Sequence, residues 1–85
     1  MTSFIEYIGY DACSGDNAVI FEKDTPVEVV MKYCIDNNHS GFSRNSLMTG
    51  RGKFYVRSHN KDSEHLRSKL RPHTCATFWI KNTLN

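Results

Sequence analysis

The predicted sheet depends most on the stretch Lys53–His59, KFYVRSH. In a β-strand, successive side chains point to opposite faces of the sheet. Alternation therefore places Phe54 and Val56 on one face, which we expect to point into the core. The other face carries basic and aromatic side chains: Lys53, Tyr55, Arg57 and His59. We predict a strand with an apolar inner face and a basic outer face.

The segment 24–38, DTPVEVVMKYCIDNN, has the strongest secondary-structure signals in the chain. Thr25 can cap a helix, and Glu28 stands three residues later, as in a capping box. Pro26 suits the first helical position, where its missing N–H is not needed. Apolar residues then recur at helical spacing: Val27, Val30, Met31, Cys34 and Ile35. This pattern predicts an amphipathic helix that packs one stripe on a sheet.

The flanking segments predict two strands and a loop. Ser3–Tyr10 and Ala18–Lys23 are rich in β-branched and aromatic residues and are separated by turn-forming residues, so we expect them to form a hairpin. Residues 40–52 hold three glycines and four serine or threonine residues without a sustained period. They predict a long loop.

The C-terminal part predicts a helix followed by a strand. Residues 63–70, SEHLRSKL, follow a possible cap at Asp62 or Ser63 and are ended by Pro72. Residues 73–82, HTCATFWIKN, predict a strand whose alternate side chains point to opposite faces. One face holds Ala76, Phe78 and Ile80, and the other holds Cys75, Thr77 and Trp79. The fold expected from this order, ββαβαβ, is a small α+β sandwich with about four mainly antiparallel strands and two helices on one face.

Composition favours a single folded domain over residues 1–85. Apolar residues make up 39% of the chain and charged residues 24%, which is an ordinary globular mixture. No apolar run approaches the ~18 residues of a membrane span, and the N-terminus lacks signal-peptide features. Three cysteines match no small disulfide framework. We therefore expect a cytoplasmic protein with reduced thiols and no membrane contact, and the small core leaves a homodimer as an open alternative.

Charge is distributed unevenly along the chain. Residues 1–40 hold two basic and seven acidic residues, whereas residues 41–85 hold nine basic and two acidic residues. Such asymmetry favours an anionic partner for the basic part, unless folding brings the two halves together and cancels the field.

The leading hypothesis is a non-enzymatic binding or inhibitor module with a basic, aromatic C-terminal face. Cations neutralise phosphates, and exposed aromatic rings can stack on unpaired bases. The expected partner is RNA, single-stranded DNA or an acidic protein that handles nucleic acid, as for a phage or mobile-element accessory protein. The predicted binding residues are Arg44, Arg51, Lys53, Tyr55, Arg57, His59, Lys61, Arg67, Lys69, Arg71 and Trp79. The alternative is an ordinary polar strand face without a ligand.

Two other functions fit the same region. His59 and His65 with Arg57 could form a ribonuclease-like, toxin-type site, because phosphodiester cleavage needs an acid, a base and a cation. No carboxylate is obviously placed to orient either histidine, which argues against catalysis. A protein-interaction module would instead use Tyr55 or Trp79 as its apolar anchor.

The cysteine and histidine residues raise the question of a zinc site. Thiolate and imidazole are its preferred ligands, and the candidates are Cys34, His39, His73 and Cys75. There is no C-x₂-C pair, and Cys34 already belongs to the apolar helical stripe. We expect structural cysteines and no metal or other cofactor.

Overall fold

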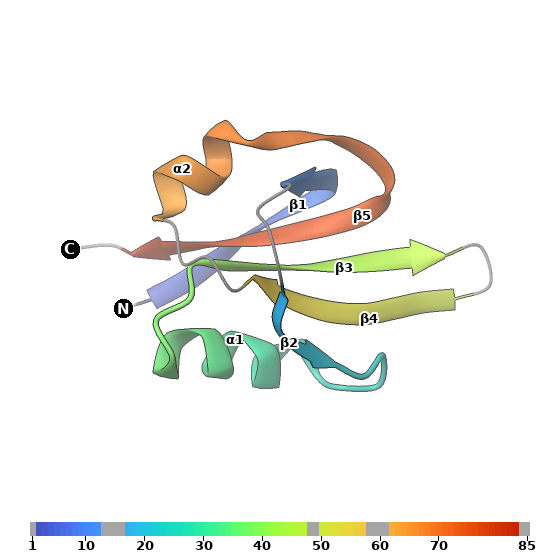
Figure 1. Ribbon diagram of the computed structural model, residues 1–85, viewed down its shortest axis with the longest axis horizontal. Coiled ribbons are helices and arrows are strands. Elements are labelled where there is room, and N and C mark those ends of the chain that lie inside the picture. Colours follow the sequence, from blue (N-terminus) through green and yellow to red (C-terminus); the bar gives the residue numbers. More distant parts are fainter. Residues whose placement is uncertain (1, 13–16, 48–49, 58–61, 84–85) are drawn as a thin grey trace.

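The computed structural model describes residues 2–12, 17–47, 50–57 and 62–83 (Figure 1). The elements in chain order are β1 (Thr2–Ala12), β2 (Asn17–Phe21), α1 (Val27–Asp36), β3 (Gly41–Leu47), β4 (Gly50–Arg57), α2 (Ser63–Ser68) and β5 (Leu70–Thr83). The strands form one five-stranded sheet in the order β1-β5-β3-β4-β2 with every neighbouring pair antiparallel. The α+β class is confirmed, and the expected count of about four strands is one too low.

The predicted N-terminal hairpin is wrong, because β1 and β2 lie at opposite edges of the sheet. β1 pairs with β5, where Ile5 lies opposite Ile80. β2 pairs with β4, where Ile20 lies opposite Tyr55. Local turn signals between the two strands do not reveal these distant partners. Three strands, β5, β3 and β4, lie between β1 and β2 in the sheet.

The predicted loop over residues 40–52 is also wrong, because β3 runs through most of it. Phe42 and Ser43 are buried at the centre of the sheet, between β4 and β5. Gly41 allows a close approach here. A Cβ at this position would lie 2.8 Å from the Trp79 carbonyl oxygen and 2.9 Å from Cε1 of Phe78. The small residues that suggested a loop therefore belong to a tightly packed central strand.

The two helices cover opposite faces of the sheet, so the prediction that both lie on one face is wrong. Trp79 of β5 packs in a core with Val30 and Cys34 of α1. Its neighbours on the strand, Phe78 and Ile80, pack instead with Leu66 of α2. Adjacent strand residues point to opposite faces. Figure 1 shows the same arrangement, with α2 above the strands and α1 below them.

Aromatic rings dominate the core on the α1 side. Trp79 stacks on Phe42 with ring centroids 4.8 Å apart and an interplanar angle of 12°. Phe54 tilts against Trp79 at 5.9 Å, and Phe4 of β1 meets Phe42 edge-on at 5.6 Å. The predicted helical stripe supplies the other side of this core, with Val30 and Cys34 buried and Val27 and Met31 partly buried. Its last member, Ile35, is instead 44% exposed.

The helix ends differ in how well the sequence predicted them. At α1 the N-cap is Pro26 without a side-chain cap, so the capping box expected from Thr25 and Glu28 does not form. At α2 the N-cap is Asp62, whose carboxylate accepts a hydrogen bond from the backbone N–H of His65 at 2.7 Å. Neither helix in the described part of the chain has the length and apolar character needed to span a membrane.

Candidate binding surface on the open part of the sheet

Among the described residues, α2 covers only part of its side of the sheet. α2 packs on β5, and the core beneath it consists of Ala12, Leu66, Phe78 and Ile80. β4 and β2 continue the same face beyond this core, where Ile20 is 48% exposed and Tyr55 is half-buried. We call Ile20, Lys53 and Tyr55 the open sheet face.

Strand register brings these three side chains together. Phe54 and Val56 are fully buried on the α1 side, so the intervening positions of β4 point the other way. Lys53 is exposed and Tyr55 is two residues further along the same face. β2 places Ile20 directly opposite Tyr55, while buried Ser43 of β3 lies opposite Tyr55 on its other side. The register predicted for this strand therefore agrees with the observed burial.

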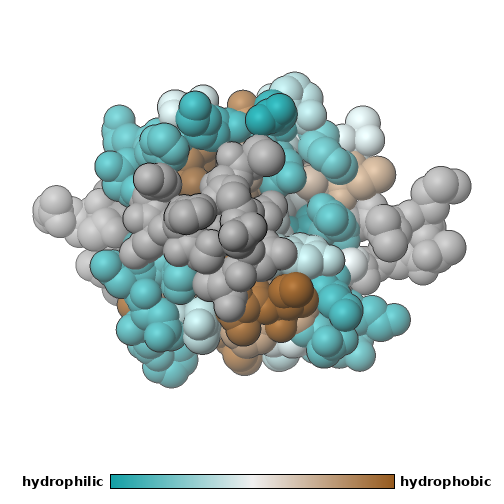
Figure 2. Space-filling model, in the orientation of Figure 1, coloured by the Kyte–Doolittle hydropathy of each residue, from teal (hydrophilic) through white to brown (hydrophobic). Residues whose placement is uncertain are grey.

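The surface around the open sheet face combines polar and apolar areas. Figure 2 shows a mostly hydrophilic face with a hydrophobic patch in its lower half, where β2 passes in Figure 1. The Lys53 ammonium lies 3.7 Å from a Glu22 carboxylate oxygen, and the two side chains are 52% and 75% exposed. Exposed pairs of this kind contribute about 0–1 kcal/mol, so Glu22 competes only weakly with another anion for Lys53.

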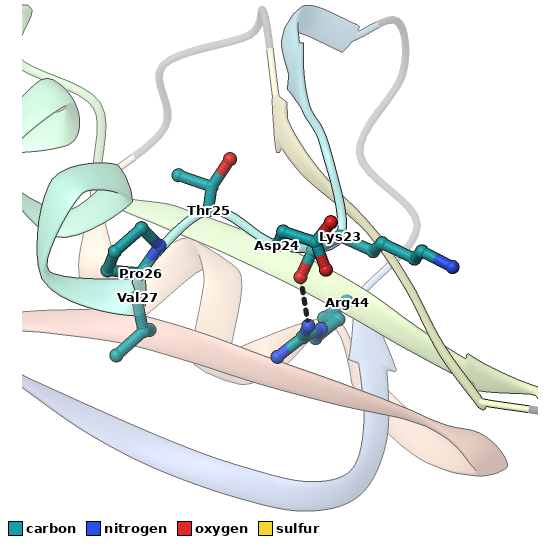
Figure 3. A pocket seen from close by; sticks show the side chains of 6 residues that line it. All are labelled: Lys23, Asp24, Thr25, Pro26, Val27 and Arg44. Carbon is teal, nitrogen blue, oxygen red and sulfur yellow. Dashed lines mark hydrogen bonds between the residues drawn. The ribbon is translucent and has the colours of Figure 1, made fainter.

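Arg44 does not belong to the open sheet face, although the sequence placed it in the binding set. It lies on the α1 side, where its guanidinium carbon is 4.3 Å from the centre of the Phe54 ring. Its Nε donates to the Gly52 carbonyl at 3.1 Å and its Nη2 to the Lys23 carbonyl at 2.6 Å. Figure 3 shows Arg44 beside the turn that leads into α1, in a hollow of about 530 Å³. These contacts tie the β2–α1 turn to the sheet.

Three other basic residues of the predicted set lie on or beside α2 and β5. Arg67 of α2 lies 3.6 Å from Glu64, whereas Lys69 and Arg71 are exposed. β1 places Asp11 opposite Arg71. In the sheet, β3 lies between β5, on which α2 packs, and β4, which carries Lys53.

Trp79 is not an exposed anchor. It is 7% exposed and stacked in the α1-side core, so its predicted roles in base stacking and partner binding are wrong. Strand alternation by itself predicts one face toward the core and one toward solvent, and this pattern put the Trp79 indole on the solvent face. In β5 both faces are inner faces, since each is covered by a helix.

For several of the predicted binding residues, the structure describes the backbone alone or no atoms at all. Arg51 and Arg57 lie within β4. His59 and Lys61 fall outside the described residues, so the catalytic pair of His59 and His65 stays a prediction. His65 itself is exposed on α2.

The four residues considered for zinc have other surroundings. Burial raises the pKa of the Cys34 thiol from 9.0 to about 12, with the Lys81 ammonium acting in the opposite direction. The His39 ring stacks on Tyr33 with centroids 5.8 Å apart. The Nδ1 atom of His73 accepts a hydrogen bond from the Cys75 backbone N–H at 3.2 Å. Across the described ranges, no group of three or more histidine, cysteine, aspartate or glutamate residues could hold a metal ion.

No protein-family model, curated protein or solved structure matches the chain. The geometry of the described residues is therefore the basis for any functional conclusion. Sequence reasoning missed Ile20 as part of the surface. The available signal was the apolar run Val19–Phe21, because a strand that is apolar on both faces needs a contact for each of them.

Proposed function

We propose that this chain is a non-enzymatic binding module that engages single-stranded nucleic acid through the open sheet face. The observation that carries the proposal is the placement of Lys53 and Tyr55 at alternate positions of β4, on a part of the sheet that α2 leaves uncovered. A cation next to an accessible aromatic ring matches the two chemical features of a nucleic-acid strand, its phosphates and its bases.

Each member of the surface has a distinct role in the proposal. Tyr55 offers a ring for base stacking, an interaction worth about 1–3 kcal/mol per base, and Ile20 extends its apolar surface. Lys53 contacts phosphate, and Arg57, four positions further along β4, is the second proposed phosphate contact. Single strands suit this surface better than a duplex because their bases are free to leave the stack.

Salt dependence tests the proposal directly. Fluorescein-labelled oligouridylate and oligothymidylate of twelve nucleotides would be titrated with the protein between 50 and 200 mM salt while anisotropy is recorded. We expect the affinity to fall with salt. Replacing Lys53 and Arg57 together by alanine should reduce the slope of log affinity against log salt by about 1.4, which is two single-strand phosphate contacts. Tyr55→Ala should weaken binding by roughly fivefold or more.

Lys32→Ala is the matched control, because Lys32 is an exposed cation on α1 that pairs with Asp36 at 2.9 Å. This variant should bind like the unaltered protein. Binding that is insensitive to salt, or a folded Tyr55→Ala protein with unchanged affinity, would contradict the proposal.

The exposure of Ile20 beside Tyr55 favours a second candidate, a protein-interaction module with Tyr55 as its anchor. Apolar anchors commonly carry most of the binding free energy of such interfaces. This function predicts a protein complex that survives nuclease treatment and is lost in both Tyr55→Ala and Ile20→Lys. An acidic protein partner would give a complex that survives nuclease but dissociates at high salt.

A further inference from the structure

β1 is a long edge strand of the sheet that the described residues form. It has eleven residues, and within the described part of the chain it pairs along one side only, with β5. The edge strand on the opposite side, β2, has five residues. The outer side of an edge strand presents backbone N–H and C=O groups that can pair with another strand.

The side chains of β1 do little to protect this edge. Ile8 is 73% exposed, Tyr10 41% and Ile5 39%, so β1 supplies half of the six exposed large hydrophobic side chains among the described residues. Edge strands are commonly protected by charged side chains, proline or β-bulges, and within residues 2–8 of β1 the one such feature is Glu6. Gly9 has φ of +81° at a register shift between Ile8 and Tyr10. The regular part of the edge is therefore the stretch 2–8.

The charge of the edge identifies the kind of strand that fits it. β1 carries Glu6 and Asp11 and no lysine or arginine, and Glu6 is exposed. If a second copy paired with the same edge in antiparallel fashion about Tyr7, the two Glu6 side chains would lie diagonally about 7–8 Å apart without a cation from either strand. A strand with a lysine or arginine opposite Glu6 gains an attractive pair instead.

We propose that the stretch 2–8 of β1 binds an extended peptide that alternates basic and apolar residues and adds to the sheet as a sixth strand. Glu6 and Ile8 point to the α1 side, because Glu6 lies opposite Trp79 and Ile8 is two residues further along. Ile5 and Tyr7 point to the α2 side, opposite Ile80 and Phe78. The basic residues of the peptide face Glu6, and its apolar residues extend the row formed by Ile5 and Tyr7.

The test uses three labelled nine-residue peptides: alternating lysine and valine, alternating glutamate and valine, and the lysine peptide with N-methyl groups on alternate backbone nitrogens. The lysine peptide should bind saturably in fluorescence anisotropy. The glutamate peptide should bind at least tenfold more weakly because of charge. The N-methylated peptide should also lose at least tenfold, because it keeps its charge but cannot complete the backbone pairing. Hydrogen exchange of the amides of residues 2–8 should slow on binding.

Two variants locate the site. Glu6→Lys should reverse the preference between the lysine and glutamate peptides, while Glu28→Lys, an exposed change on α1, should leave it unaltered. Tyr55→Ala should not affect peptide binding, which separates this inference from the proposed nucleic-acid function. Equal binding of the N-methylated peptide, or an unchanged preference in Glu6→Lys, would overturn the proposal. A dimer of the peptide-free chain with protected β1 amides would assign the edge to a second copy and overturn it as well.

Discussion

The two sides of the sheet differ in how completely a helix covers them. α1 has ten residues and a core of six buried residues from α1, β3, β4 and β5. α2 has six residues and a core of four. At 1.5 Å per residue α2 is about 9 Å long and α1 about 15 Å. Among the described residues, the part of the sheet that α2 leaves uncovered carries the candidate surface.

The largest expected effect tests the α1 side as the main source of stability. Trp79→Ala removes the ring that stacks on Phe42 and contacts Phe54. It should lower the free energy of unfolding by about 3–5 kcal/mol, measured by urea denaturation. Tyr55→Ala on the open sheet face should cost less than about 1 kcal/mol. Similar losses in the two variants would show that the two sides contribute alike.

A second variant tests how closely β3 packs against β5 and α2. Gly41→Ala would place a Cβ 2.8 Å from the Trp79 carbonyl oxygen and 2.9 Å from Cδ1 of Leu66. Because the first of these atoms is backbone, relief requires a strand to move, and we expect a loss of about 1–3 kcal/mol.

Gly9→Ala is the matched control for this substitution. Apart from its chain neighbours, no described residue has an atom within 4 Å of the added Cβ, but the φ of +81° is strained for alanine. The expected cost is about 1 kcal/mol, from backbone strain alone. If Gly9→Ala proved the more costly of the two, close packing at Gly41 would not be the stronger constraint.

A third prediction concerns the pH dependence contributed by Cys34. The folded pKa of about 12 lies above the ordinary value of 9.0, so at alkaline pH the unfolded chain loses this proton first. The contribution is therefore complete below pH 9 and declines by up to about 1.4 kcal/mol per pH unit between pH 9 and 12. Cys34→Ala should show a shallower decline in unfolding free energy over this range. An identical pH profile in the variant would contradict the burial of the thiol.

Local patterns predicted the elements that depend on local signals. The α1 stripe at Val30 and Cys34, the Asp62 cap and the register of Phe54 and Val56 are all confirmed. Each depends on residues within a few positions of one another, or on burial of one alternating set. The failures concern pairing between distant segments. The glycine and serine residues of β3 have low intrinsic strand propensity, so the local sequence predicts a loop. β3 is a strand because it pairs with β4 and β5 on its two sides, and the local sequence does not show this pairing.

The candidate surface shows the same division. Lys53 and Tyr55 could be predicted to share a face, because a single strand determines that relation. The apolar run at Val19–Phe21 indicates that Ile20 needs a contact, but its place beside Tyr55 follows only from the pairing of β2 with β4. Trp79 was misplaced for the converse reason, because only the tertiary structure shows that helices cover both faces of β5.

The smallest expected effect distinguishes a surface selected for binding from an ordinary polar strand face. Glu22→Gln removes the carboxylate that lies 3.7 Å from the Lys53 ammonium while keeping the size of the side chain. Both partners are exposed, so the free energy of unfolding should change by less than about 0.5 kcal/mol. Affinity for a labelled single strand should rise by roughly twofold, because Lys53 no longer has to leave a carboxylate in order to contact a phosphate. Asp36→Asn, which frees Lys32 on α1 in the same way, should leave the affinity unchanged. If both variants raised the affinity equally, the affinity would depend on the net charge of the protein. Lys53 would then not be a specific contact for the single strand.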